Sequence, residues 1–225
     1  MLEKKVKEVL DFIKGGNPFG EQITVVGASK TMSVEIINEA ISYGLTVVAE
    51  NRVQEFREKH QLISPAARQH FIGHLQTNKV KYLVGKVDLI HSVDSVHLAQ
   101  EINSAAQKKG LTQAILIEIN VGGELSKSGF DFENAKENIQ IISSECKNLR
   151  VEGLMAMFPR SDDEEVLKPL FQKMRALYDD CVLNGYDFHH LSMGMSNDYK
   201  LAIKYGSNMI RLGPAIFGQR NYGEK

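Results

Sequence analysis

Short, continuously apolar runs alternate with segments of helical spacing along almost the whole chain, and this alternation limits the fold more than any other feature of the sequence. A continuous apolar run is typical of a strand that is buried on both faces, as in a parallel sheet. In the first unit, the run 23–28 is followed by a helical segment that begins at the N-cap residue Ser33 and ends at Gly44. The predicted strands are 23–28, 46–49, 70–72, 87–91, 113–120, 150–155, 188–191 and 209–212.

Each predicted strand is followed by something helical, and eight such units predict an α/β fold in which the strands close into a (β/α)8 TIM-type barrel. An open, doubly wound sheet is the competing fold, but no G-x-G-x-x-G follows the first strand. No Pro-rich or Ser-rich linker interrupts the 225 residues, so we expect a single domain over 1–225. The predicted helices are 33–43, 52–62, 78–84, 95–108, 132–146, 164–183 and 197–205.

An additional helix is predicted before the first strand, over residues 2–14. It is rich in Glu and Lys, which a signal peptide or a membrane anchor would not be. Its apolar residues fall on one face, so we expect a packing helix. Those residues are Leu2, Val6, Val9, Leu10 and Ile13.

The composition excludes several classes of function. Basic and acidic residues nearly balance, at 27 and 28, which leaves no positive field for nucleic acid or an anionic membrane. Cys146 and Cys181 are far apart and lack metal-ligand spacing, as expected in a reducing cytoplasm. The pair His189 and His190 is not expected to bind zinc, because neighbouring strand residues point to opposite faces. We therefore expect no metal site.

Lys30 is the first candidate functional residue, because it directly follows the first buried strand, at the barrel end where active sites form. Desolvation there would lower the pKa of its amine and favour the neutral nucleophile, which can form a Schiff base. The alternative is a side chain that extends from the rim into water. Partner residues are needed to decide between the two interpretations.

A candidate phosphate site follows the last two strands, which is where barrels often bind phosphate. The stretch from Ser192 to Asp198 places small residues and the Ser196 hydroxyl before a helix, whose free amides favour an anion. Gly213 allows a second approach of the backbone. The alternative is a helix cap that binds no ligand.

Arg211 ends the last strand, two residues before Gly213. A permanently charged guanidinium there could donate to the ring nitrogen of a pyridine cofactor and keep that nitrogen unprotonated. Such a ring is a weaker electron sink for carbanion chemistry. The alternative is an ordinary salt bridge at the rim.

Taken together, the motifs around these residues resemble the pyridoxal phosphate homeostasis protein family over nearly the whole chain. The individual motifs are weak, but the set is specific. They are V-G-A-S-K at 26–30, E-N-R-V-Q-E at 50–55, H-F-I-G-H-L-Q-T-N-K at 70–79, S-K-S-G at 126–129, G-L-M-A-M at 153–157, L-S-M-G-M-S-N-D at 191–198 and R-L-G-P-A-I-F-G at 211–218.

The resemblance implies a barrel of fold type III, similar to the N-terminal domain of alanine racemase, with pyridoxal 5′-phosphate held as a Schiff base on Lys30. It implies that the phosphate lies among Ser192, Ser196 and Gly213 and that Arg211 faces the pyridine nitrogen. It also implies that Asn51 and Met155 lie near the ring. Members of the family are cytoplasmic, monomeric or weakly dimeric, and without an established catalytic reaction. One departure concerns phosphate binding, because Pro214 stands where the family has a small hydroxyl residue.

Three functions remain open from the sequence. A racemase of this type needs a second acid/base group from an additional domain, and the chain stops at Lys225, so we expect no such domain and no catalytic residue. We expect a carrier or buffer of pyridoxal phosphate that supports vitamin B6 and amino-acid homeostasis, with apo-enzymes as partners. The alternatives are an amino-acid racemase that pairs Lys30 with a rim residue such as His74, and a sugar-phosphate enzyme without this cofactor.

Overall fold

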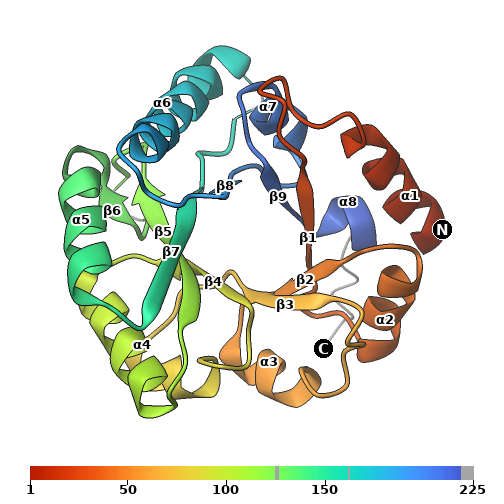
Figure 1. Ribbon diagram of the computed structural model, residues 1–225. Helices are drawn as coiled ribbons and strands as arrows, with labels where there is room; N and C mark the ends of the chain where they lie inside the picture. Colours follow the sequence, from red (N-terminus) through yellow and green to blue (C-terminus); the bar gives the residue numbers. More distant parts are fainter. Residues whose placement is uncertain (125–126, 162, 219–225) are drawn as a thin grey trace.

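Parallel strands form a closed barrel surrounded by helices in the computed structural model, which describes residues 1–124, 127–161 and 163–218 (Figure 1). Within that part of the chain, β1 pairs with β2 and β9, and the pairing of β4 with β5 closes the ring of eight strands. The predicted barrel is therefore confirmed. Its strands are β1 (Thr24–Ala28), β2 (Val47–Glu50), β3 (Arg68–Phe71), β4 (Leu89–Val93), β5 (Gln113–Asn120), β7 (Leu149–Ala156), β8 (His190–Ser192) and β9 (Met209–Leu212).

Helices cover the outside of the ring, as the alternation of the sequence predicts (Figure 1). Those with a predicted range follow it to within three residues, and the short α8 forms after β9, where no helix range was predicted. They are α1 (Leu2–Ile13), α2 (Val34–Ser42), α3 (Val53–Lys59), α4 (Val96–Lys108), α5 (Ala135–Glu145), α6 (Glu164–Leu183), α7 (Tyr199–Lys204) and α8 (Pro214–Phe217).

Two local features differ from the prediction. The expected helix at 78–84 is a 3-10 helix, η1 (Thr77–Tyr82). Its buried Val80 and the following buried Leu83 are three residues apart, a spacing that the three-residue turn of a 3-10 helix places on one side. A short strand, β6 (Phe130–Asp131), pairs with the end of β5 and precedes a 3-10 turn, η2 (Phe132–Asn134). Two residues are too few to show a strand pattern.

Apolar side chains fill the barrel itself, and separate clusters join its outer surface to the helices. A filled interior is usual for this architecture, in which branched side chains stack in layers between the strands. The interior is therefore a packed core, and functional groups are expected at the rim where the strands end. The interior cluster consists of Val26, Val47, Ala49, Leu89, Ala114, Leu116, Met155 and Met209, with Ile72 packed against it.

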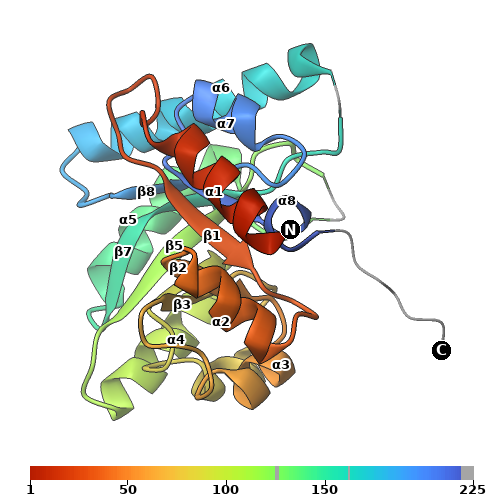
Figure 2. The same cartoon turned by 90° about the vertical axis from the view of Figure 1, so that its right-hand side faces the viewer.

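Helix α1 lies against the outside of the barrel beside α8, as Figure 2 shows. Val6 and Val9 are buried in an outer cluster with Ile37 and Ile216, and the other predicted apolar positions of α1 pack against that cluster. The predicted packing helix is thus confirmed. No helix within the described residues is long and apolar enough to cross a membrane.

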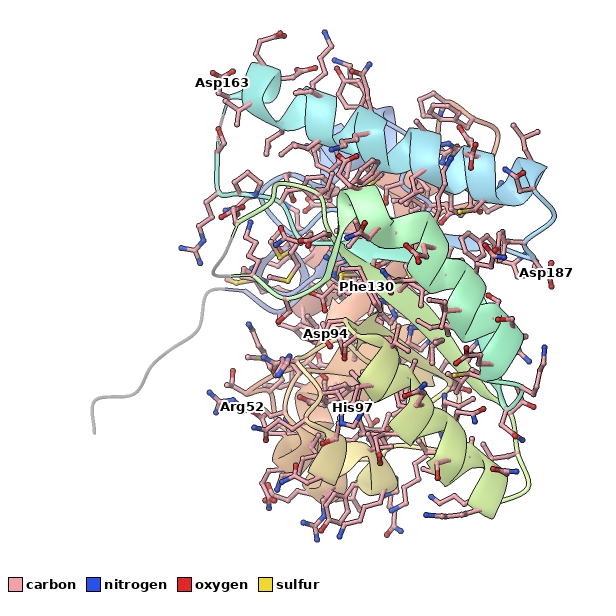
Figure 3. All side chains as sticks on the ribbon, turned by 90° about the vertical axis from the view of Figure 1, so that its left-hand side faces the viewer. Arg52, Asp94, His97, Phe130, Asp163 and Asp187 are labelled. Atoms are coloured by element: carbon pink, nitrogen blue, oxygen red, sulfur yellow. The ribbon has the colours of Figure 1, made fainter. Side chains whose placement is uncertain are left out.

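The two ends of the barrel differ in what they carry (Figure 3). Arg52 and Asp94, which follow β2 and β4, lie at one end, and Asp187, which precedes β8, lies at the other. The loops that follow the strands therefore share a rim, as expected for parallel strands. Ser126, in one of the recognised motifs, lies outside the described residues.

Candidate functional site

The residues predicted for the site all stand at the carboxyl ends of barrel strands. Because β1 and β8 both pair with β9, the loops that follow these three strands are neighbours in space. The predicted positions are Lys30 after β1, Asn51 after β2, Met155 near the end of β7, Ser192 at the end of β8, Ser196 in the following loop, Arg211 in β9 and Gly213 after it.

Arg211 and Ser192 are in direct contact, and both are buried. One guanidinium nitrogen of Arg211 donates to the Ser192 hydroxyl at 2.7 Å and to the Ser192 carbonyl oxygen at 2.8 Å. The other terminal nitrogen donates to the carbonyl oxygen of Ala156 at 2.9 Å. Burial lowers the pKa of Arg211 to about 10, although the charges of Glu118 and Asp198 oppose the shift, so the guanidinium remains protonated at neutral pH. Its hydrogen-bond acceptors in the described residues are uncharged, so this is no ordinary salt bridge.

Ser196 and Gly213 are joined by a second contact. The Ser196 hydroxyl accepts hydrogen bonds from the amides of Gly213 and Ala215, both at 3.2 Å. The two amides flank Pro214, which occupies the first turn of α8, where its missing N–H leaves no helical hydrogen bond unmade. The loop therefore directs two amides at one oxygen atom despite the proline.

The loop between β8 and α7 is the first of the two loops predicted to hold a phosphate. Helix α7 begins only at Tyr199, and the amide of Met195 is already bonded to the carboxylate of Asp198 at 2.6 Å. The amides that converge on Ser196 belong to the loop after β9 and the first turn of α8. These hydrogen bonds join the two predicted loops, and a phosphate site between both loops stays a prediction.

Lys30 is half-buried and occupies the second position of a tight turn, in which the Met32 amide donates to the Ser29 carbonyl oxygen at 3.0 Å. The third position is Thr31, which has a φ of 66°. Glycine is usual where a turn needs positive φ, because a side chain there is strained. A branched residue in this region costs about 1–3 kcal/mol and persists only where surrounding contacts hold it.

The turn that carries Lys30 lies beside the loop after β9, which contains Gly213. A Cβ atom added at Gly213 would stand 3.7 Å from the carbonyl oxygen of Ala28, the last residue of β1. The amine-bearing turn and the converging amides thus follow strands whose ends are in contact. Asn51 and Met155 stand at the ends of β2 and β7, and the Asn51 amide oxygen is buried without a hydrogen-bond partner in the described residues.

A chain of buried hydrogen bonds leads from Arg211 into the barrel. The Ser192 hydroxyl lies 3.2 Å from Nδ1 of His91, and Nε2 of His91 lies 2.9 Å from Nδ1 of His70. Burial, with smaller contributions from nearby charges, lowers the pKa of His70 to about 3 and that of His91 well below its usual range. Both imidazoles are therefore neutral at pH 7.

The donors in this chain can be assigned from its ends. Arginine only donates, so the hydroxyl hydrogen of Ser192 has the Nδ1 atom of His91 as its acceptor among the contacts of that oxygen. His91 then carries its proton on Nε2 and donates to His70. The hydrogen bonds run in one direction, from Arg211 through Ser192 and His91 to His70.

Glu118 adds a titratable group to the same end of the barrel. Its position on β5 is in register with Met155, which in turn is in register with Ser192. Burial, with the charge of Asp94, raises the pKa of Glu118 to about 7, although Arg211 opposes the shift. This carboxyl group therefore titrates near neutrality.

Comparison with known proteins decides the family. Residues 25–221 match the sequence profile described as alanine racemase, N-terminal domain. A pyridoxal phosphate homeostasis protein of Aquifex aeolicus is 46% identical over 201 residues, which cover 88% of this chain and 87% of that relative. The chain belongs to the pyridoxal phosphate homeostasis protein family.

Two solved structures extend the similarity of this family member to the whole fold. A protein of unknown function from Bifidobacterium adolescentis is 33% identical, with a TM-score of 0.89 over 96% of this chain and 94% of that one. PipY of Synechococcus elongatus, in a structure with PLP bound, is 26% identical, with a TM-score of 0.85 over 97% of this chain and 100% of that one.

Several residues at the site of this family member escape prediction from the sequence. His70 and His91 are at inward positions of β3 and β4, and the alternation of inward residues, such as Leu89 and His91, is the signal that could have found them. The Ala215 amide could not have been found from the sequence, because every residue except proline has a backbone N–H.

Proposed function

We propose that this protein binds pyridoxal 5′-phosphate as a Schiff base on Lys30 and carries or buffers it rather than turning over a substrate. Pyridoxal phosphate supplies an aldehyde that condenses reversibly with an amine. The observation that carries the proposal is the convergence of two backbone amides on the Ser196 hydroxyl, next to the end of the strand that bears Lys30. PipY and the homeostasis proteins provide the cofactor by analogy.

The donor set suits a phosphate group. The amides of Gly213 and Ala215 both donate to the Ser196 hydroxyl, so this hydroxyl has its own hydrogen to donate to a phosphate oxygen, and the two amides can turn to phosphate oxygens if the hydroxyl moves aside. Pro214 removes one potential amide donor but leaves the two beside it. Ser192 is less available, because its hydroxyl is engaged by Arg211 and His91. We therefore assign the phosphate to the Ser196–Gly213–Ala215 side of the site, with Ser192 supporting Arg211.

Arg211 supports a storage role. A guanidinium that remains protonated at neutral pH can donate to a pyridine nitrogen but cannot give that nitrogen a proton, so the ring stays a weak electron sink. We place Arg211 at the ring nitrogen and Asn51 and Met155 beside the ring. Among the residues that the structure describes, the buried amide oxygen of Asn51 has no hydrogen-bond partner, and a ring hydroxyl would supply one.

The proposed binding is tested by chemical trapping. The protein is incubated with pyridoxal phosphate, reduced with borohydride and digested, and the peptide that carries the added mass is identified. We expect the mass on Lys30 alone, with Lys30→Arg, which keeps the charge, as the negative control. Label spread over surface lysines would contradict the proposal. Mixing loaded protein with an apo-enzyme and comparing recovered activity with that from free cofactor then tests the carrier role.

The phosphate assignment predicts a selective loss of affinity in Ser196→Ala. Hydrogen bonds to charged groups contribute about 1.5–3 kcal/mol, so we expect the Kd for pyridoxal phosphate to rise at least about tenfold. The Kd for pyridoxal, which lacks the phosphate, should change little. Equilibrium titration with both ligands measures the effect, with Ser144→Ala on the exposed face of α5 as the control. An equal loss for both ligands would place the phosphate elsewhere.

The cysteines bear on where the protein works. Both described cysteines, Cys146 and Cys181, are buried and free, which agrees with a reducing cytoplasm. We propose a cytoplasmic monomer or weak dimer that supports vitamin B6 and amino-acid homeostasis by delivering the cofactor to apo-enzymes.

A further inference from the structure

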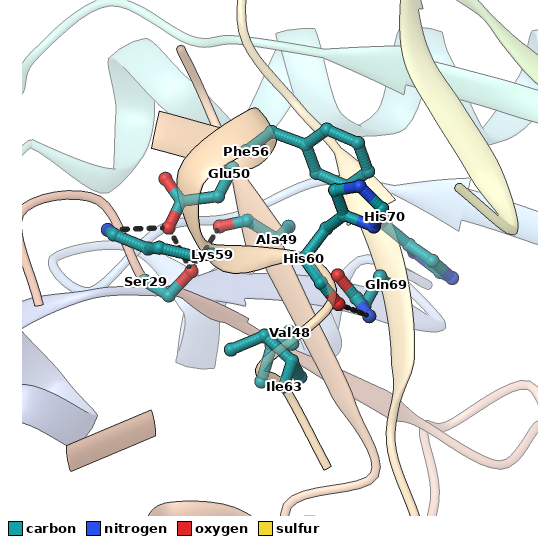
Figure 4. A pocket seen from close by; sticks show the side chains of 10 residues that line it. All are labelled: Ser29, Val48, Ala49, Glu50, Phe56, Lys59, His60, Ile63, Gln69 and His70. Carbon is teal, nitrogen blue, oxygen red and sulfur yellow. Dashed lines mark hydrogen bonds and ion pairs between the residues drawn. The ribbon is translucent and has the colours of Figure 1, made fainter. Parts of the chain in front are cut away.

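A network of three charged side chains, Lys59, Glu50 and Glu55, lies beside the turn that carries Lys30, and Figure 4 shows Lys59 with Glu50. Lys59, at the end of α3, is 3.0 Å from the carboxylate of Glu50 and 2.8 Å from that of Glu55. All three side chains are largely shielded from water, with exposed fractions of 14%, 7% and 17%. A buried network of this kind holds its geometry better than an exposed ion pair does.

Both neighbours of Lys30 in the sequence are bonded to this network. The Ser29 hydroxyl donates to Oε1 of Glu50 at 2.8 Å, the same oxygen that Lys59 contacts (Figure 4). The Thr31 amide donates to Oε2 of Glu55 at 2.8 Å, again the oxygen that Lys59 contacts. One ammonium group therefore joins the carboxylates that hold the residues before and after Lys30.

The network also accounts for the strained turn. Thr31 has positive φ, a conformation that requires contacts to hold it, and its amide is bonded to Glu55. Because Lys59 fixes Glu55, loss of Lys59 should let the turn relax. The turn would then no longer place the Lys30 amine at one position relative to the loop after β9.

The charges make the two lysines chemically different. The hydrogen bonds and charges of Glu50 and Glu55 outweigh burial and raise the pKa of Lys59, so this amine stays protonated and unreactive toward an aldehyde. The two carboxylates are bonded to the residues on either side of Lys30, so without the counter-charge of Lys59 we expect them to favour the charged form of the Lys30 amine.

We propose that Lys59, Glu50 and Glu55 form a clamp that fixes the turn of Lys30, and that Lys59 is thus a positioning residue for the reaction of the Lys30 amine with an aldehyde. The inference rests on the proposed function of Lys30. It assigns Lys59 a role that differs from that of a second reactive amine, although both lysines lie near the ends of β1 and β2.

The clamp is tested with Lys59→Met, Lys59→Arg and the control Lys7→Met, which removes an exposed lysine paired with Glu3 on α1. The rate of pyridoxal phosphate attachment to Lys30 is measured by timed borohydride trapping and peptide mass. We expect about a tenfold fall in Lys59→Met. Lys59→Arg should retain more of the rate, and Lys7→Met should match the unsubstituted protein.

Two further readouts separate positioning from a general loss of structure. Acetylation of Lys30 by acetic anhydride, which needs no cofactor, is followed against pH, and Lys59→Met should shift its midpoint upward because two carboxylates lose their counter-charge. Thr31→Gly should restore much of the trapping rate in Lys59→Met, since glycine adopts positive φ without strain. If Lys59→Met is too unstable to assay, Glu55→Gln takes its place: the trapping rate should again fall, but the acetylation midpoint should shift downward, because this variant removes a negative charge.

The outcomes are distinct. If the unsubstituted protein gives no trapped mass on Lys30, the proposed function fails. If it does, but Lys59→Met reacts at the same rate with an unchanged acetylation midpoint, the clamp is wrong. A slower rate that Thr31→Gly does not restore, with the midpoint unchanged, likewise overturns it and leaves Lys59 with a structural role only.

Discussion

Replacing His91 with alanine should lower the free energy of unfolding by about 3 kcal/mol at pH 7, one of the two largest effects that we expect from a single substitution. His91 is fully buried and hydrogen-bonded through both ring nitrogens. The substitution leaves a cavity, removes the donor to His70 and removes the acceptor of the Ser192 hydroxyl hydrogen, and a buried donor or acceptor left unsatisfied costs about 1–3 kcal/mol. Urea unfolding measures the loss. His189→Ala, whose side chain is 57% exposed, should change stability by less than about 0.5 kcal/mol.

The same substitution should alter the response to acid. A pKa lowered from 6.5 to about 3 means that His70 binds a proton in the unfolded state more readily than in the folded state. The stability that depends on neutral His70 is therefore present above pH 6.5 and is lost as the pH falls towards 3, by up to about 5 kcal/mol. His91 acts in the same direction. The free energy of unfolding should therefore fall less steeply with decreasing pH in His91→Ala. An unchanged slope would show that protonation of these imidazoles does not cause the loss of stability in acid.

The fold is largely predictable because each buried parallel strand of more than a few residues appears in the sequence as a continuous apolar run. The apolar runs 113–120 and 209–212 coincide with β5 and β9, and the barrel rule then places the residues after each strand at one rim. Lys30, Arg211 and Gly213 could be selected on that basis alone. The two-residue strand β6 is too short to appear as an apolar run.

The contacts within the site are less predictable, because they join residues far apart in the chain. His70 and His91 are 21 residues apart, and Ser192 is a further 101 away. Which inward side chains meet depends on the stagger of the strands, which no local pattern encodes. Thr31 shows the same limit, since threonine is not a residue type from which positive φ would be expected.

These long-range contacts connect the core of the barrel to its candidate site. The hydrogen bonds of His70 and His91 end at Ser192, and Ser192 in turn contacts Arg211. A change inside the barrel can therefore displace the guanidinium at its mouth. Stability and ligand affinity should thus be measured together in variants of this chain.

Glu118→Gln should stabilise the protein at alkaline pH by up to about 3 kcal/mol and change little at pH 5. The pKa of Glu118 is raised from 4.5 to about 7, chiefly by burial and then by the charge of Asp94, so the folded state binds this proton more tightly than the unfolded state. The corresponding stability is present in full below pH 4.5 and is lost as the pH rises through 7. Glutamine has no charge to bury, so the variant lacks this loss.

The sign of the pH dependence separates this effect from a simple change in packing. Urea unfolding of both proteins at pH 5, 6, 7 and 8 should give a difference that grows with pH, whereas altered packing would give a constant one. Glu137→Gln on the exposed face of α5 is the matched control and should show no growth. Because ionised Glu118 also favours the charge of Arg211, a difference that shrinks with pH would mean that attraction to Arg211 outweighs burial.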